Sequence, residues 1–255
     1  MFRDAFLIAR RDFRAYFVSP IAYIVMAVFL ALMAFFFLRA VGYFLTASQQ
    51  FLQYSQGSRP TVSEIVVLGV YETMGVILLF IVPAITMRLF AEERRDRTDV
   101  LLLSSPVNPW AIILGKFFAA LAFVWVLLAG TLPYPLILLL TSEVDAGILV
   151  TNYVGLTLLI GSFIAIGLLF SALTENQVVA FVLTMGTLLF MWVIAGAAYS
   201  AGPVWSEIVR YLSITTHYAN FSSGVVDTSD AVYYLSVIAL GLFGTYLAFD
   251  ANQWS

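Results

Sequence analysis

Few side chains in this chain could do chemistry. His217 is the only histidine and there is no cysteine, which excludes disulfides, thiolate nucleophiles and metal sites built from several histidines. Carboxylates remain. Glu72 lies inside an apolar run, and Glu92 and Glu93 stand among arginines in FAEERRDRTDVLLLSSP, residues 90–106. None of these places a base beside a nucleophile. We therefore expect no catalytic residue and no metal ligand.

The elements that must position these residues are apolar. The chain is 62% hydrophobic and 11% charged, with a mean hydropathy of +0.97, which is typical of a membrane protein that crosses the bilayer several times. Apolar runs of about 18 residues or more predict transmembrane helices. The runs are 21–38, 65–89, 110–140, 148–173, 178–198 and 231–249. We predict an all-α membrane protein, one domain over residues 1–255, with six spans.

Basic residues gather on one side of the predicted spans. They are Arg3, Arg10, Arg11, Arg14, Arg88, Arg94, Arg95, Arg97 and Lys116. By the positive-inside rule both termini and residues 90–106 are cytoplasmic, while the loop TSEVDAG, which lacks Lys and Arg, lies outside. The net charge of −3 has the wrong sign for a nucleic-acid-binding protein.

Residues 1–19 alternate between apolar and basic positions. Aromatic residues and an alanine recur at spacings of three and four, at Phe2, Phe6, Ala9, Phe13 and Phe17, while Arg10, Arg11 and Arg14 fall largely on the remaining face. This pattern predicts an amphipathic helix on the inner leaflet, ended by Pro20. The alternative is a polar extension of the first span.

The charged stretch 90–106 reads as a short exposed helix. Glu92 with Arg95, and Glu93 with Arg97, are acid-first pairs at helical spacing. An apolar run follows, and Ser-Ser-Pro ends it. A charged start with an apolar flank suits docking into a groove of a partner protein. The alternative is a solvated linker whose leucines pack against the bundle.

Four further positions could belong to a path or gate. Pro133 and Pro135 remove backbone donors and predict a kink or break, either for packing alone or for transport. Glu72 could face a cavity or reach water. His217 could position a substrate or make a structural hydrogen bond. It lies in an outer segment, residues 200–230, for which we predict two short helices before the last span.

The pattern resembles a known family. Glu92-Glu93, Thr98, Leu101 to Leu103, Ser105-Pro106 and Gly115-Lys116-Phe117 resemble the signature after the second helix of type-2 ABC exporter permeases, the six-helix ABC-2 class. YFVSPIAYIV and HYANFSSGVVDTSDAVYYLS resemble gliding-motility ABC permeases in particular. The resemblance covers nearly the whole chain and implies a permease in a bacterial inner membrane.

The resemblance also implies partners and roles. The permease would work as a dimer with a second copy or a paralogue, and a separate ATPase would bind ATP and Mg. The chain has no phosphate-binding loop, so no cofactor is expected in it. Residues 90–106 would be the coupling helix, a role carried to Glu92, Glu93, Arg94, Thr98, Leu101, Leu102 and Leu103. A second cytoplasmic contact would involve Arg10, Arg11, Arg14 and Glu175.

Other functions compete with this one. The dimer could transmit ATPase motion to an envelope or periplasmic accessory protein without moving a solute. An intramembrane hydrolase would need a nucleophile and base or facing acids within the spans, and the spans contain no histidine and no pair of acids at such depth. A secondary transporter would show matching broken helices in two halves, and none is evident.

Overall fold

The chain is helical throughout the parts that the computed structural model describes, residues 2–54, 61–95, 108–197 and 203–251. No strand occurs in these residues, and six of their helical stretches are long and apolar enough to cross a membrane. The predicted all-α membrane protein with six spans is confirmed.

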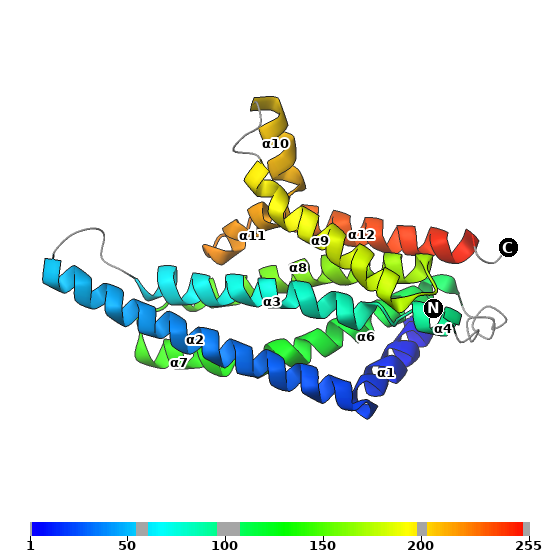
Figure 1. Ribbon diagram of the computed structural model, residues 1–255, viewed down its shortest axis with the longest axis horizontal. Coiled ribbons are helices and arrows are strands. Elements are labelled where there is room, and N and C mark those ends of the chain that lie inside the picture. Colours follow the sequence, from blue (N-terminus) through cyan, green and yellow to red (C-terminus); the bar gives the residue numbers. More distant parts are fainter. Residues whose placement is uncertain (1, 55–60, 96–107, 198–202, 252–255) are drawn as a thin grey trace.

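The helices run mostly along the long axis of the molecule, and α10 projects away from it (Figure 1). In chain order they are α1 (Phe2–Val18), α2 (Pro20–Tyr54), a π-helical turn η1 (Ser63–Val67), α3 (Leu68–Thr86), α4 (Ala91–Arg95), α6 (Pro109–Gly130), α7 (Pro133–Thr141), α8 (Ala146–Leu173), α9 (Gln177–Ala197), α10 (Pro203–Leu212), α11 (Ile214–Ser222) and α12 (Thr228–Ala251). Helices α10 and α11 occupy the outer segment where two short helices were predicted.

Two spans differ in shape from a single straight crossing. Helix α2 continues to Tyr54, far beyond the apolar run 21–38, because no proline or glycine interrupts TASQQFLQY. The third run is broken, with α6 ending at Gly130 and α7 starting at Pro133. Proline fits the first turn of a helix, where its missing N–H is not needed. Pro133 and Pro135 therefore start a new helix.

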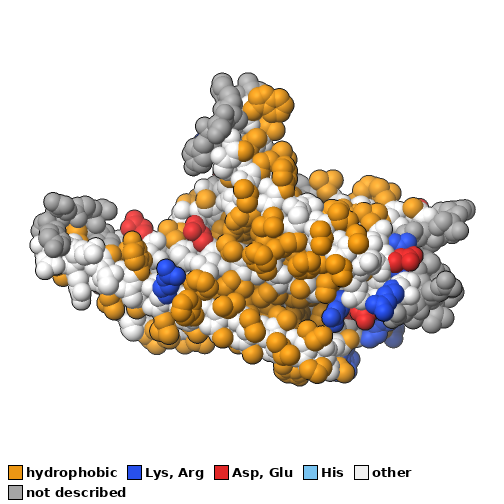
Figure 2. Space-filling view, in the orientation of Figure 1, with side chains coloured by type: hydrophobic (Ala, Val, Ile, Leu, Met, Phe, Trp, Pro, Cys, Tyr) orange, Lys and Arg blue, Asp and Glu red, His pale blue; other side chains and the backbone are white. Residues whose placement is uncertain are grey.

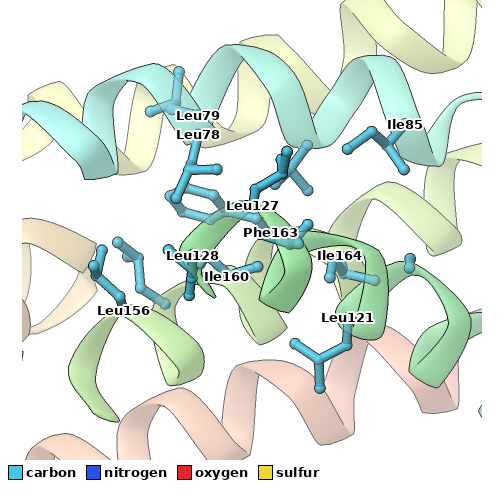
Figure 3. Close-up of a cluster of buried hydrophobic side chains, with 14 of the residues drawn as sticks. Leu78, Leu79, Ile85, Leu121, Leu127, Leu128, Leu156, Ile160, Phe163 and Ile164 are labelled. Carbon is cyan, nitrogen blue, oxygen red and sulfur yellow. The ribbon is translucent and has the colours of Figure 1, made fainter. Parts of the chain in front are cut away.

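Helix α8 is the centre of the bundle. It packs against α3, α6, α9, α11 and α12, and much of its length is buried. Leu78 of α3, Leu127 of α6 and Phe163 of α8 lie in one apolar cluster (Figure 3). Close approach to α3 depends on Gly167, where a Cβ atom would lie 2.1 Å from Thr86 Oγ1. Any larger residue would push the two helices apart.

The outer surface of the bundle is apolar. Hydrophobic side chains cover the middle of the face seen in Figure 2, and Lys and Arg gather mainly at the end that carries α1 and α4. Only 22% of the most apolar window of α2 is buried, against 72% for α8. Exposed apolar side chains of this extent fit a lipid environment.

Helix α1 is a separate helix that lies on α6. The chain turns at Ser19 before α2 begins. Ala5 is buried, and a Cβ atom at Gly115 of α6 would lie 2.7 Å from Ile8 Cγ2. Phe2 and Phe6, which the amphipathic pattern places on the apolar face, are exposed. Phe13 and Phe17, farther along the same stripe, are partly buried and pack against the core. The aromatic stripe therefore contacts the bundle only in the second half of α1.

Candidate functional site

Four helices meet at one end of the bundle through a set of buried and partly buried polar groups. We call this set the α4 junction and define it as Asp12 of α1, Glu93 of α4, Lys116 of α6 and Ser171 of α8. Each side chain comes from a different helix, so the junction exists only in the folded bundle.

Lys116 is the centre of the junction. Its side chain is 3% exposed, and its ammonium donates to Glu93 Oε1 at 2.7 Å and to the Leu89 carbonyl at 2.7 Å. Asp12 Oδ2 lies 3.6 Å from the same nitrogen, and the ring of Phe90 lies below it at 5.0 Å. A buried ammonium needs such partners because its desolvation is costly. Lys116 thereby joins α1, α4 and α6.

Ser171 and Arg94 hold α4 from the side of α8. The Ser171 hydroxyl accepts from the backbone N–H groups of Phe90 and Ala91 at 3.0 and 3.1 Å, and it donates to the Met87 carbonyl at 3.1 Å. These are N–H groups that the start of a helix leaves without partners. Arg94 donates to the Ala172 carbonyl at the end of α8. The start of α4 is thus fixed to the bundle.

The charges of α4 fall on two faces. Glu93 and Arg94 are partly buried and bind the bundle, whereas Glu92 and Arg95 are exposed. Among the residues expected in the coupling helix, Thr98, Leu101, Leu102 and Leu103 lie outside the described residues. Of the others, Glu92 is the one whose side chain is exposed.

The residues expected to make a second cytoplasmic contact are only partly brought together. Arg11 hydrogen-bonds Asp12 at 2.8 Å and lies 3.8 Å from Glu93, so it belongs to the rim of the junction. Arg10 and Arg14 are exposed on α1, and Glu175 is exposed in the turn between α8 and α9. In that turn Asn176 Oδ1 accepts from the Val178 N–H and caps the start of α9.

A pocket of about 530 Å³ opens beside the junction, between α1, α2, α3 and α6. Asp12, Arg88 and Glu92 contribute charge to its lining, and Tyr16 and Phe123 contribute aromatic rings. Burial raises the pKa of the Tyr16 hydroxyl, and the nearby Asp12 carboxylate raises it further. Tyr16 therefore keeps its proton and remains a hydrogen-bond donor.

A second polar group lies in the outer segment, and we call it the His217 cluster: His217, Asn220, Asp230 and Tyr233. His217 Nδ1 lies 2.7 Å from Asp230 Oδ1, and Nε2 lies 3.0 Å from the Tyr211 carbonyl. Asn220 donates to Asp230 Oδ2 at 2.7 Å, and Tyr233 stacks on the imidazole at 3.9 Å. The structural hydrogen bond, one of the two readings of His217, is present.

The sequence also matches a known protein family. The model described as ABC-2 family transporter protein matches residues 6–253, nearly the whole chain. The chain belongs to the ABC-2 transporter family. Membership makes it a multi-pass membrane permease of an ABC transporter and implies an ABC ATPase as its partner. The chain is the membrane component of the transporter and is distinct from that ATPase. No protein in a search of curated sequences matches this ABC-2 permease.

The remaining predicted positions of the ABC-2 permease lie on three different helices. Glu72 is exposed on α3, His217 is buried in its cluster on α11, and Pro133 and Pro135 begin α7. Their role in a path or gate stays a prediction. Among described residues no three His, Asp or Glu side chains gather as they would around a metal ion.

Sequence reasoning about the ABC-2 permease missed three of the four junction residues. It used Lys116 as a topology signal, although an ionisable residue inside an apolar run also signals a buried partner. Asp12 could have been noticed as an acid among the arginines of α1. A serine in the apolar run of α8 carries no signal of its own, because its role depends on a neighbour 81 positions away.

Proposed function

We propose that this chain forms the transmembrane path of an ABC exporter as a dimer, with a separate ATPase docked at α4 and the residues that follow it. The ATPase binds ATP and Mg. The permease lies in a bacterial inner membrane with both termini and the α4 end in the cytoplasm, as the distribution of Lys and Arg predicts.

The observation that carries this proposal is the fixing of α4. A helix that transmits force from an ATPase must be tied to the membrane helices, or its movement would be lost. Lys116 ties α4 to α6 through Glu93 and the Leu89 carbonyl, and Ser171 ties its start to α8. Movement of α4 therefore carries α6 and α8 with it, and ATP-driven closure of two ATPases would shift the bundle between two states.

The exposed face of α4 gives the docking proposal a sharp test. Glu92→Arg reverses a charge that holds nothing inside the permease, so it acts on the partner and spares the fold. We expect detergent co-purification of the tagged chain with the ATPase encoded beside it to fall at least about tenfold, since close interfacial charge pairs contribute about 1.5 kcal/mol or more.

The matched control is Glu143→Arg, an exposed acid in the loop between α7 and α8 at the opposite end of the bundle. It should retain the ATPase as the wild type does. Equal retention by Glu92→Arg and the wild type would show that α4 is not part of the docking surface. ATP hydrolysis by the complexes would then show whether the retained ATPase is coupled.

A second function is favoured by α10. This helix projects from the bundle (Figure 1). Trp205, Ile208 and Tyr211 on it are exposed. Such a surface suits contact with an envelope partner, so the complex could transmit motion without moving a solute. Stimulation of ATP hydrolysis by a transported compound in proteoliposomes would favour export. Stimulation only by an envelope protein, lost in Trp205→Ser, would favour mechanotransmission.

A further inference from the structure

The pocket beside the α4 junction changes character along its length. Asp12, Arg88 and Lys116 contribute charge to its lining, and Ile21, Val25 and Phe123 contribute apolar side chains. Phe123 follows Lys116 by seven residues on α6, which is about 10 Å along a helix. The apolar wall therefore extends from the charged rim toward the middle of the bundle, as the acyl region of a bilayer does from its headgroups.

The charged rim has both signs and unused hydrogen-bonding capacity. Tyr16 Oη and Asp12 Oδ2 are buried without a hydrogen-bond partner among the described residues, although Asp12 Oδ2 is within ion-pair distance of Lys116. Arg88 is exposed, and no ion pair joins it to another described residue. A buried hydroxyl without a partner is costly, which indicates a group that binds there.

We propose that this pocket binds one phospholipid whose headgroup carries a phosphate and a primary ammonium, as in phosphatidylethanolamine. Tyr16 and Arg88 donate to the phosphate oxygens. The ammonium donates to Asp12 Oδ2, and the upper part of an acyl chain lies against Ile21, Val25 and Phe123. The site goes beyond the proposed function, because it requires neither the ATPase nor a transported compound.

The phosphatidylethanolamine headgroup fits this pocket better than the headgroups of phosphatidylglycerol and phosphatidylcholine. Phosphatidylglycerol has the phosphate but no cation for Asp12, and the choline headgroup has a cation with no N–H to donate. Hydrogen bonds to charged groups are worth enough to produce about a tenfold difference in affinity or more. A bound lipid here would contact α1, α2, α3 and α6 together.

The test is lipid binding to the delipidated full-length chain in detergent, followed by native mass spectrometry. The probes are phosphatidylethanolamine, phosphatidylglycerol and phosphatidylcholine with identical acyl chains. We expect one phosphatidylethanolamine to bind the wild type about tenfold more tightly than either of the others. Asp12→Asn, which keeps the shape of the side chain, should remove this preference. Arg88→Gln should weaken all three lipids alike, because each carries the phosphate, and should leave the preference in place.

Two substitutions outside the pocket serve as controls. Glu175→Gln and Arg14→Gln make the same charge changes at exposed positions outside the pocket lining, and both should bind lipid as the wild type does. Ala84→Phe fills the pocket and should weaken binding of all three lipids, with size-exclusion chromatography to verify folding.

Two results would overturn the proposal: equal binding of the three lipids by the wild type, or an unchanged preference in Asp12→Asn. Because the assay contains no ATPase, either result leaves the docking of α4 untouched. Conversely, loss of docking in Glu92→Arg is measured by ATPase retention and does not depend on the lipid.

Discussion

The α4 junction and the His217 cluster of this permease differ in how far apart in the sequence their bonded residues lie. The α4 junction joins residues from α1, α4, α6 and α8, and its hydrogen bonds connect positions 23 and 81 residues apart. The His217 cluster closes within one segment, because His217 bonds to Asp230 13 positions later and to Tyr211 six positions earlier. The junction therefore holds separate helices together, whereas the cluster fixes the local fold between α10 and α12.

This difference predicts which substitutions affect the ATPase contact and which affect only the stability of one segment. A change at the junction should disturb both the bundle and the ATPase contact. A change in the His217 cluster should loosen the outer segment and leave the ATPase bound. Each of the following variants tests one side of this distinction.

The largest effect is expected for Lys116→Met. The methionine keeps most of the apolar stem but removes the buried cation of Glu93 and Asp12, which leaves them only Arg11 at the rim. Removing one partner of a buried ion pair costs about 3 to 5 kcal/mol, so the unfolding temperature in detergent should fall clearly and ATPase retention should fall with it. The double variant Lys116→Met with Glu93→Gln removes both charges and should recover part of the loss. A wild-type unfolding temperature for Lys116→Met would contradict the central role of Lys116.

The His217 cluster is tested by Asp230→Asn, which keeps the size of the side chain but removes the charge. The amide cannot accept from both His217 and Asn220 as the carboxylate does, so we expect a loss of about 2 kcal/mol. Hydrogen exchange should accelerate in residues 211–233 while ATPase retention stays at the wild-type level. Asp227→Asn is the control, because Asp227 is exposed and asparagine caps a helix equally well. Loss of the ATPase in Asp230→Asn would show that the cluster is not local.

Ser171→Ala tests the side of the junction that lies on α8. It leaves the N–H groups of Phe90 and Ala91 without their acceptor, at a cost of about 1 to 2 kcal/mol. Amide exchange should rise at residues 87–95 and ATPase retention should weaken moderately. Ser236→Ala is the matched control, since that exposed hydroxyl bonds only within α12. Equal amide exchange at residues 87–95 in Ser171→Ala and Ser236→Ala would show that Ser171 does not hold α4.

The smallest effect, and a baseline for the others, is expected for Gly186→Ala on α9. No atom lies within 4 Å of a Cβ atom built at this glycine, which is exposed. Alanine favours the helix over glycine by up to about 1 kcal/mol, so the unfolding temperature should stay or rise slightly. A marked fall would indicate that this face of α9 meets another protein, such as a second copy of the permease.

Much of the fold was accessible from the sequence. Six apolar runs predicted six spans, and Pro133 with Pro135 predicted the break between α6 and α7. The length of α2 was not predicted, because its second half lacks the continuous apolarity that marks a span yet contains good helix-forming residues. Hydropathy detects burial in lipid and does not detect a helix that continues beyond it.

The candidate site was accessible only in part. The charges of α4 drew attention because they interrupt apolar sequence, but the division between Glu92, which is exposed, and Glu93, which is held by Lys116, depends on how α4 sits on α6. The partnership of His217 with Asp230 likewise requires the turn between α11 and α12, where Gly224 adopts a φ of +87° that other residues rarely adopt. Such contacts are tertiary and leave no periodic pattern in the chain.

Helix α8 also gives the molecule a fixed internal length. It contains no proline and runs unbroken for 28 residues, or about 42 Å. Ser171 near one end binds the start of α4, and Asn152 near the other donates to the Ser222 carbonyl of α11. An unbroken hydrogen-bonded rod transmits axial displacement without shortening, so a thrust delivered at the α4 end would reach α11 in the same stroke, with no break inside α8 to absorb it.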